Sequence, residues 1–458
     1  MNYLKVLFDL YNAKNNVKKS AAQIKKLQQK KLRKMLKYAY DHSEFYHQTF
    51  QAAGITDKYI ESTPLENFPT IDKQILLSHF DKIITVSDIT QEELLRFDES
   101  TEKDRRAFKG KYHVVHSSGS TGKPGYFVYD NNAWNAMLIG IIRAALWGMS
   151  MPQILKFLAE KPRIAYIAAT DGRYGGAMAV GDGIDGVGAS QIYLDVKTPL
   201  SEWVERIREF KPNMIIGYSS AVKILAELVE SGDVELEIAQ VVTCGEPLGA
   251  NLRRYLENAF NTKVINFYGA SESLALGVEV DPEQGMILFD DMNMIEVCED
   301  GMYLTSLYNF AQPLIRYRLS DSLTLENADE SCPFTRAVGL LGRNEDVLWF
   351  EDSEGNREFL HPLAVEGFCI EGLTDYQFVQ LGNNKFEMRA QISASSSHSD
   401  IRAKIIEQME AVLNEKHLNF VNFNVKFVDE ITPDITTGKK RLIIGNFQIP
   451  GCETRRAV

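Results

Sequence analysis

The sequence predicts an α/β fold, with a large N-terminal layered α/β domain that begins with a helical segment, and a small C-terminal α+β domain. The chain has 458 residues. A single hydrophobic core rarely supports a chain of this length, so more than one domain is expected. Short apolar runs such as RIAYIAA and AQVVTCG alternate with amphipathic segments such as PLSEWVERIREF, which is typical of parallel strands covered by helices. Past residue 342 the pattern changes to a strand, helix, strand order.

The first fifty residues are expected to be helical. Between Val17 and Phe50, apolar residues recur at helical spacing with lysines between them. These apolar residues are Ile24, Leu27, Leu32, Met35, Leu36 and Ala39. We expect the lysines to form a solvated face; a membrane-surface or partner-binding helix is the alternative.

A strand and then a helix are expected after residue 125. GYFVYD has the composition of a short strand, and NNAWNAMLIGIIRAALWGM that of a helix. Asp130 is the expected N-cap, because its carboxylate can accept hydrogen bonds from the free amides of the first turn. The predicted apolar stripe of this helix comprises Trp134, Met137, Leu138, Ile141, Ile142, Ala145 and Leu146.

A domain boundary is expected close to Gly342. Beyond it, LGNNKFEMRAQISAS and FNVKFVDEI alternate polar and apolar residues, and SDIRAKIIEQMEAVLNEKH between them has helical spacing. We therefore predict an N-terminal domain of residues 1–342 and a C-terminal domain of residues 343–458.

Composition and charge exclude several classes of protein. The chain is 45% hydrophobic and 24% charged, with a formal net charge of -12, which argues against non-specific binding to nucleic acid or to an anionic membrane. No apolar run has the length of a signal-peptide core or a membrane span. The five cysteines are scattered without a C-x-x-C pair, which favours structural thiols over a zinc site. We expect a cytoplasmic protein.

One loop, HSSGSTGKPGYF, concentrates hydroxyls and glycines around Lys123. It is not a P-loop, because only two residues separate Gly119 from Gly122, and Pro124 stands where the magnesium-binding hydroxyl would be. Its backbone amides, its hydroxyls and the ammonium of Lys123 could still converge on phosphate oxygens. From this stretch alone, a polar hairpin loop is an equal alternative.

Six motifs together resemble those of the adenylate-forming enzymes, the superfamily of acyl-CoA synthetases, luciferases and non-ribosomal adenylation domains. In chain order they are SSGSTGKP, CGEPL, INFYGASES, LIRYRLSD, GRNED and TTGKKR. HSEFYHQTFQAAGI and NFPTIDKQIL are similar to the N-terminal segment of the phenylacetate-CoA ligase and capsule-polysaccharide adenylating branch. The resemblance spans nearly the whole chain.

The resemblance implies an ATP-dependent carboxylic acid ligase. Such an enzyme joins a small-molecule carboxylate to AMP, releases pyrophosphate and then forms a thioester with coenzyme A. Transfer to another acyl acceptor, and a non-catalytic nucleotide-binding protein of the same fold, are the alternatives. Retention of Glu272 and Lys439 favours an enzyme, because neither is needed simply to hold adenosine. By the same analogy, a homodimer is expected.

The resemblance also assigns roles to residues. ATP binding falls to Ser117, Ser118, Gly119, Ser120, Thr121, Gly122, Lys123, Gly245, Glu246, Pro247, Tyr268, Gly269, Ser271, Asp321 and Arg343. Among these, Ser117 to Lys123 would hold the β- and γ-phosphates, Tyr268 would lie against adenine, and Asp321 would accept hydrogen bonds from the ribose hydroxyls.

The expected catalytic residues are Glu272, as the ligand of Mg²⁺, and Lys439, with Lys440 as its competitor by sequence. Asp321 is preceded by Ser320, where the family generally has glycine. The hinge of a mobile C-terminal domain would be Glu345, where the family usually has aspartate.

The acyl pocket would involve Tyr218 and Ala270. Aromatic-acid ligases of this branch typically have two histidines in the stretch that aligns with GMILFDDMNMIE, where this chain has Ile287 and Met292. This difference argues against phenylacetate itself and leaves the identity of the acid open.

Overall fold

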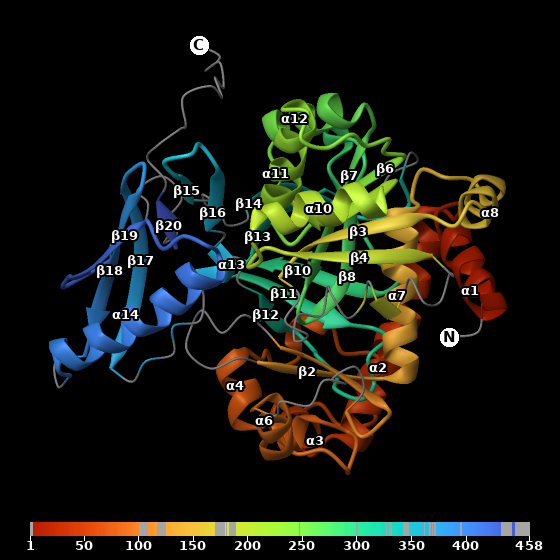
Figure 1. Cartoon of the computed structure of the whole chain (residues 1–458). Helices are drawn as coiled ribbons and strands as arrows, with labels where there is room; N and C mark the ends of the chain where they lie inside the picture. The colour runs from red at the N-terminus through yellow and green to blue at the C-terminus, as the bar shows by residue number, and fades with distance from the viewer. Residues whose placement is uncertain are drawn as a thin grey trace.

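The computed structural model describes residues 3–99, 108–116, 125–169, 179, 181–182, 189–246, 248–298, 301–319, 321–326, 328, 332–341, 348–360, 362–365, 368, 370, 372–393, 396–431 and 442–444. Its elements form a large N-terminal body and a smaller C-terminal unit beside it (Figure 1). The predicted fold class is thus confirmed. The boundary placed after Gly342 falls outside the described residues and stays a prediction.

Helices open the chain, but the segment predicted to be helical up to Phe50 is divided. α1 (Tyr3–Asn16) is followed by α2 (Ala21–His42) and α3 (Glu44–Ala52). Ser43 separates the last two because its backbone is extended and its hydroxyl accepts a hydrogen bond from the amide of Tyr46, which starts a new helix. Of the predicted apolar residues of α2, all except Leu27 are buried.

A nine-stranded sheet forms the centre of the large body, in the order β13-β14-β9-β8-β7-β6-β5-β3-β4. Five strands run parallel: β3 (Arg163–Ala168), β4 (Ser190–Asp195), β5 (Met214–Tyr218), β6 (Gln240–Cys244) and β7 (Val264–Ala270). The other four pair antiparallel: β8 (Ser273–Glu279), β9 (Met286–Leu288), β13 (Ser322–Glu326) and β14 (Arg336–Leu341). The expectation of largely parallel strands therefore holds for only one half of the sheet.

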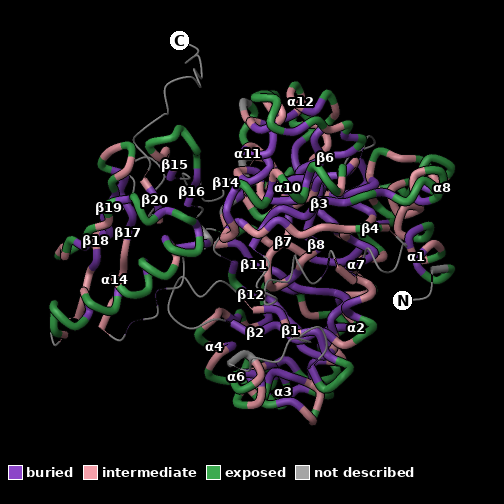
Figure 2. The backbone as a smooth tube through the Cα atoms, in the orientation of Figure 1, coloured by how far each residue is buried: buried purple, intermediate pink, exposed green. Residues whose placement is uncertain are grey.

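Each face of this sheet is covered by its own hydrophobic cluster. Ile164 and Tyr166 of β3 pack in the same cluster as residues of α7 (Asn131–Ala145). Their neighbours Ala165 and Ile167 belong to the cluster that includes α10 (Leu200–Phe210), α11 (Ser219–Glu230) and α12 (Ala250–Phe260). This alternation is what the two-residue period of a strand requires, and Figure 2 shows the resulting buried centre.

Helix α7 carries the predicted N-cap and one residue that its apolar pattern did not predict. The carboxylate of Asp130 accepts a hydrogen bond from the amide of Ala133 at 2.7 Å, which confirms the cap. Arg143, however, is fully buried. Its guanidinium donates to both carboxylate oxygens of Asp291, at 2.7 and 3.0 Å, and lies 4.2 Å from the ring centre of Phe289. A helix expected to bury only apolar groups thus also buries an ion pair.

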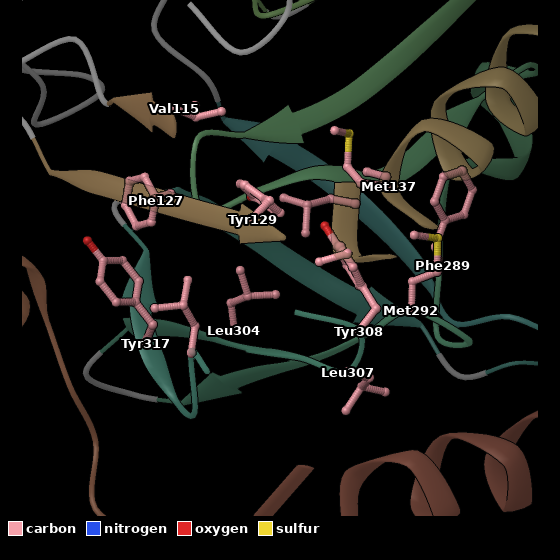
Figure 3. Packing of buried hydrophobic residues seen from close by; sticks show 14 of the residues in the cluster. Val115, Phe127, Tyr129, Met137, Phe289, Met292, Leu304, Leu307, Tyr308 and Tyr317 are labelled. Atoms are coloured by element: carbon pink, nitrogen blue, oxygen red, sulfur yellow. The ribbon is translucent and has the colours of Figure 1, made fainter. Parts of the chain in front are cut away.

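Two small sheets lie beside the large one. β1 (Tyr112–His116) and β2 (Tyr126–Asp130) form an antiparallel hairpin, so the strand predicted after the phosphate loop is confirmed. β10 (Asn293–Cys298), β11 (Gly301–Ser306) and β12 (Tyr317–Leu319) form the other. In the packed interior that Figure 3 shows, Tyr129 lies near Tyr308, and Tyr317 lies beside Phe127, with ring centres 6.1 Å apart.

The C-terminal unit confirms the predicted strand, helix, strand order as β18 (Lys385–Ile392), α14 (His398–Glu415) and β19 (Asn422–Phe427). Two further strands complete its four-stranded sheet, β17 (Leu373–Gly382) and β20 (Ile443–Ile444). A hairpin of β15 (Leu348–Glu351) and β16 (Arg357–Leu360) precedes them. None of the helices in the described part of the chain combines the length and the apolarity needed to cross a membrane.

Candidate active site

The carboxyl ends of three parallel strands place several predicted residues at one edge of the sheet. β5 ends at Tyr218, β6 at Cys244 and β7 at Ala270, and ligands of open α/β sheets bind at such edges. Gly245 follows β6 with a φ of 75°. A β-carbon there would lie 2.7 Å from the ring of Tyr218, so the tyrosine can cover this turn only because the residue is glycine.

Ser271 and Glu272 form the turn between β7 and β8, where Ala270 pairs with Ser273. Gly269 allows the strands to approach closely, because a β-carbon there would lie 2.5 Å from the carbonyl oxygen of Leu274. The buried hydroxyl of Tyr129 donates to the carbonyl oxygens of Ser271 and Glu272, at 3.3 and 3.2 Å. The hairpin of β1 and β2, which carries Tyr129, therefore holds this turn in place.

The same turn adjoins the start of the predicted phosphate loop. The hydroxyl of Ser271 donates to the carbonyl oxygen of His116 at 3.3 Å. His116 is the last residue of β1 and pairs with Tyr126, the first residue of β2. The segment 117–124, which connects them, lies outside the described residues, but both of its anchors are fixed beside the turn that carries Glu272.

Asp321 joins this site from the segment between β12 and β13. Its carboxylate accepts a hydrogen bond of 2.8 Å from the hydroxyl of Tyr268. Tyr268 is buried, at 8% exposed, and lies on β7 two residues before the turn. The two acidic residues predicted to contact ATP and its metal, Asp321 and Glu272, therefore share one site.

Glu272 has a half-buried carboxyl group, and nearby positive charge balances its negative charge only in part. Burial raises its pKa to about 7, and the nearby charge of Asp321 acts in the same direction. Its own backbone amide, the ammonium of Lys73 and the hydroxyl of Tyr317 act against the rise without cancelling it. Near neutral pH this group is therefore present in both protonation states.

Lys73 and Tyr317 were not predicted as site residues. Lys73 opens α4 (Lys73–Ser78), and burial lowers its pKa while the charge of Glu272 opposes that effect. The strand of Tyr317 holds this segment, because Ile71 forms a parallel bridge with Tyr317. Arg316, in a left-handed conformation with φ of 49°, donates to the carbonyl oxygens of Glu66 and Phe68 at 2.7 and 2.8 Å. The N-terminal segment is thereby fixed beside Glu272.

Glu246, assigned to ATP binding, directs its carboxylate to the start of a helix. It accepts hydrogen bonds from the amide and hydroxyl of Ser220, at 2.8 and 2.9 Å, and from the hydroxyl of Ser219 at 3.1 Å. These residues begin α11, so the carboxylate caps this helix. The side chain of Glu246 therefore fixes the loop after β6 to the end of β5.

Comparison with known proteins tests the resemblance to the adenylate-forming enzymes. No protein-family model matches the chain. It is 22% identical to Protein CapK of Staphylococcus aureus, with 92% of this chain and 89% of that protein covered. It is 25% identical to the phenylacetate-coenzyme A ligase of Pseudomonas putida, with 81% and 83% covered. A solved 2-hydroxyisobutyryl-CoA ligase, in complex with 2-HIB-AMP and CoA in the thioesterification state, shares the fold with a TM-score of 0.59 and 20% identity, over 93% of this chain and 90% of that one.

The resemblance to the adenylate-forming superfamily is confirmed. Within that superfamily, the chain is similar to the branch of the phenylacetate-CoA ligases and CapK. The similarity extends over most of the chain. Of the six motifs, INFYGASES lies wholly in the described fold, and CGEPL and LIRYRLSD lie in it except for Pro247 and Ser320. Of the assigned residues, Gly245, Tyr268, Gly269, Ser271, Glu272 and Asp321 lie around the ends of β6 and β7 or, for Asp321, in contact with Tyr268.

Glu246, Tyr218 and Ala270 are described as well. The other assigned residues fall outside the described part of the chain. They are Ser117, Ser118, Gly119, Ser120, Thr121, Gly122, Lys123, Pro247, Arg343, Glu345 and Lys439. Their roles stay predictions. Ile287 and Met292, at the positions where aromatic-acid ligases have histidines, are both buried. Met292 lies against α7, where a β-carbon at Gly140 would be 2.8 Å from its sulfur.

The chemistry of the described groups fits a hard divalent cation. Mg²⁺ prefers oxygen ligands and is usually held by one or two carboxylates together with substrate phosphates. Glu272 offers such an oxygen next to the anchors of the predicted phosphate loop. Burial raises its pKa and the charge of Lys73 opposes this rise without cancelling it, so a bound cation would stabilise the ionised form.

Proposed function

We propose that the protein is an ATP-dependent carboxylic acid ligase that forms an acyl-adenylate and then a coenzyme A thioester. The observation that carries this proposal is the meeting of Glu272, Asp321 and the anchors of the 117–124 loop at one edge of the sheet. The function of the named relatives supports the same reaction class. A small-molecule carboxylate, ATP and coenzyme A are then the substrates.

In the first half-reaction, a carboxylate oxygen of the acid attacks the α-phosphorus of ATP. A new phosphorus–oxygen bond forms, and the bond to pyrophosphate breaks with its electron pair leaving on pyrophosphate. Because an anion attacks an anion, catalysis depends on positioning and on positive charge around the phosphates. Lys73 and, by family analogy, Lys123 and Lys439 supply ammonium groups for this purpose.

The second half-reaction consumes the adenylate. The thiolate sulfur of coenzyme A attacks the acyl carbon, and AMP leaves with the electron pair of the broken carbon–oxygen bond. By the same analogy, the C-terminal unit rotates about Glu345 between the two half-reactions. Tyr218 and Ala270 would line the acyl group, because they end β5 and β7, the two strands that flank β6 and the turn of Gly245 that follows it.

Glu272 would hold Mg²⁺, which neutralises phosphate charge when it is bound. Asp321 would bind the ribose hydroxyls through the acceptor sites that its single hydrogen bond from Tyr268 leaves open. Tyr129 and Ser271 keep the turn of Glu272 in place. None of these groups forms a covalent bond to the substrate in this scheme.

The test is an exchange assay between ATP and labelled pyrophosphate across a broad panel of carboxylic acids, with and without coenzyme A. We expect exchange that depends on one class of acid, and thioester formation when coenzyme A is added. Lys439→Ala should abolish most of the exchange while nucleotide binding persists, whereas Lys440→Ala should retain it. A wild-type protein that binds ATP but exchanges no label with any acid would contradict the proposal.

A further inference from the structure

A buried ion pair of the C-terminal unit is hydrogen-bonded to the large body. Lys416, directly after α14, has a fully buried side chain, and its ammonium lies 2.8 Å from the carboxylate of Glu358 on β16. The same ammonium donates to the carbonyl oxygens of Thr198 and Val196, at 2.6 and 3.3 Å. The second carboxylate oxygen of Glu358 accepts a hydrogen bond of 2.6 Å from the amide of Leu200, at the start of α10.

Both members of the pair belong to the C-terminal unit. The β15–β16 hairpin is tied to the β17–β18 turn by two hydrogen bonds between Glu351 and Asn384, at 3.1 and 2.7 Å, and by a third at 2.8 Å from Gln380 to the carbonyl of Trp349. Leu348, Phe350 and Leu360 of the hairpin pack in the core of that unit. Lys416 and Glu358 must therefore move together whenever the unit moves.

The other face of the hairpin packs against the large body. Phe359 is fully buried in the cluster under α10, with ring centres 5.4 Å from Trp203 and 5.6 Å from Trp349. The ammonium of Lys416 lies 3.9 Å from the ring centre of Phe359. The pair thus covers an aromatic cluster that would become exposed if the unit moved away; Figure 1 shows β16 on the side of the C-terminal unit that faces the large body.

Physical chemistry makes such a pair selective for one arrangement. Two charges in a dry interface recover little free energy beyond their desolvation, but either one alone is strongly unfavourable there. The ammonium of Lys416 and the amide of Leu200 reach all of their acceptors only when residues 196–200 lie against Glu358 and Lys416. After separation, water hydrates both charges, so the arrangement is specific without being permanent.

We propose that Lys416 and Glu358 are positioning residues that hold the C-terminal unit in one of its working orientations and so set the balance between adenylation and thioester formation. This inference rests on the proposed function, in which the two half-reactions need different orientations. The two residues touch no substrate; they act through the position of the unit that carries Lys439.

The first arm of the test measures orientation without activity. Lys416→Met leaves Glu358 without its charge partner, so the interface should open and the emission of Trp203 and Trp349 should shift to longer wavelength in the folded protein. The double variant Lys416→Met/Glu358→Gln removes the uncompensated charge and should restore much of the wild-type emission. Lys404→Met, on an exposed position of the same helix, should leave the emission unchanged.

The second arm measures the ratio of pyrophosphate exchange to thioester formation. Lys416→Met should change this ratio by about tenfold or more, because breaking a buried pair strongly disfavours one orientation. Unchanged emission, or equal losses in both half-reactions, would overturn the proposal. If Lys416→Met does not fold, Glu358→Gln is subject to the same two criteria. An inactive wild-type protein would refute the proposed function, while the emission arm would still decide whether the pair fixes the orientation.

Discussion

Two carboxylates in the large body, the buried Asp291 and the half-buried Glu272, have opposite electrostatic environments. Burial alone would raise the pKa of Asp291, but the charge and hydrogen bonds of Arg143 hold it below its ordinary value. The side-chain amide of Asn16 donates a further hydrogen bond at 2.7 Å. At Glu272 burial prevails, and the pKa rises to about 7. One carboxylate is fully partnered, and the other has partners too weak to compensate for its burial.

The difference separates a structural group from a binding group. Asp291 joins α1 to α7 through Asn16 and Arg143, so its charge is neutralised permanently. Glu272 lies at the proposed phosphate edge, where a cation would complete its environment. The following variants test this contrast, beginning with the largest expected effect.

Arg143→Met should lower the free energy of unfolding by about 3–5 kcal/mol, because it leaves Asp291 charged and unpaired in the interior. Urea unfolding monitored by circular dichroism measures the effect. Lys223→Met, which removes a partly exposed ion pair with Glu227 on α11, should cost less than about 1 kcal/mol. Equal effects of the two variants would contradict the structural role of Asp291.

Glu272→Gln should raise the free energy of unfolding at alkaline pH, whereas Arg143→Met lowers it. A carboxyl whose pKa rises on folding from 4.5 to about 7 contributes stability below pH 4.5 that is lost as the pH rises through 7. Replacing it should therefore stabilise the ligand-free protein at pH 8 by at most about 3 kcal/mol, with little effect at pH 5. Urea unfolding at both pH values is the measurement. A loss of stability at pH 8 would show that Glu272 is fully partnered.

Lys73→Met should reduce acid-dependent pyrophosphate exchange by about tenfold, because one of the positive charges facing Glu272 and the phosphates is lost. Lys73→Arg keeps the charge and should retain most of the activity. The assay is exchange at saturating ATP, with circular dichroism as the check on folding. If both variants behave alike, the role of Lys73 is geometric rather than electrostatic.

Tyr268→Phe should have the smallest effect, a loss of about 1 kcal/mol in the free energy of unfolding. It removes only the hydrogen bond to Asp321, whose carboxylate is half-buried and can turn to water. Thermal or urea unfolding measures the change. A loss above about 3 kcal/mol would indicate that this hydrogen bond maintains the whole edge of the sheet.

The sequence predicted those features that depend on neighbouring residues. The helix after Asp130 and the strands of RIAYIAA and AQVVTCG follow from local periodicity, and the assignment of Glu272 follows from a contiguous motif. Arg143 could not be distinguished within its apolar helix, because its partner Asp291 lies 148 positions away. The antiparallel half of the sheet was missed for the same reason, since short strands such as β9 have no pattern of their own.

The site shows the same division. Motifs indicated Tyr268, Glu272 and Asp321, and the structure brings these three together. Lys73 lies in the quoted NFPTIDKQIL stretch and Tyr317 in LIRYRLSD, but only the bridge between Ile71 and Tyr317 shows that these stretches meet. A long-range backbone contact, invisible in either stretch, brings the lysine to the carboxylate.

The central claim is that the carboxyl group of Glu272 binds a cation together with the nucleotide. A ¹³C nuclear magnetic resonance titration of glutamate-labelled protein, compared with Glu272→Gln to assign the signal, measures this directly. In the free protein the carboxyl should titrate near pH 7, and Mg²⁺ with a non-hydrolysable ATP analogue should move the midpoint to lower pH. A midpoint near 4.5 in the free protein, or one that the metal and nucleotide do not move, would contradict the account.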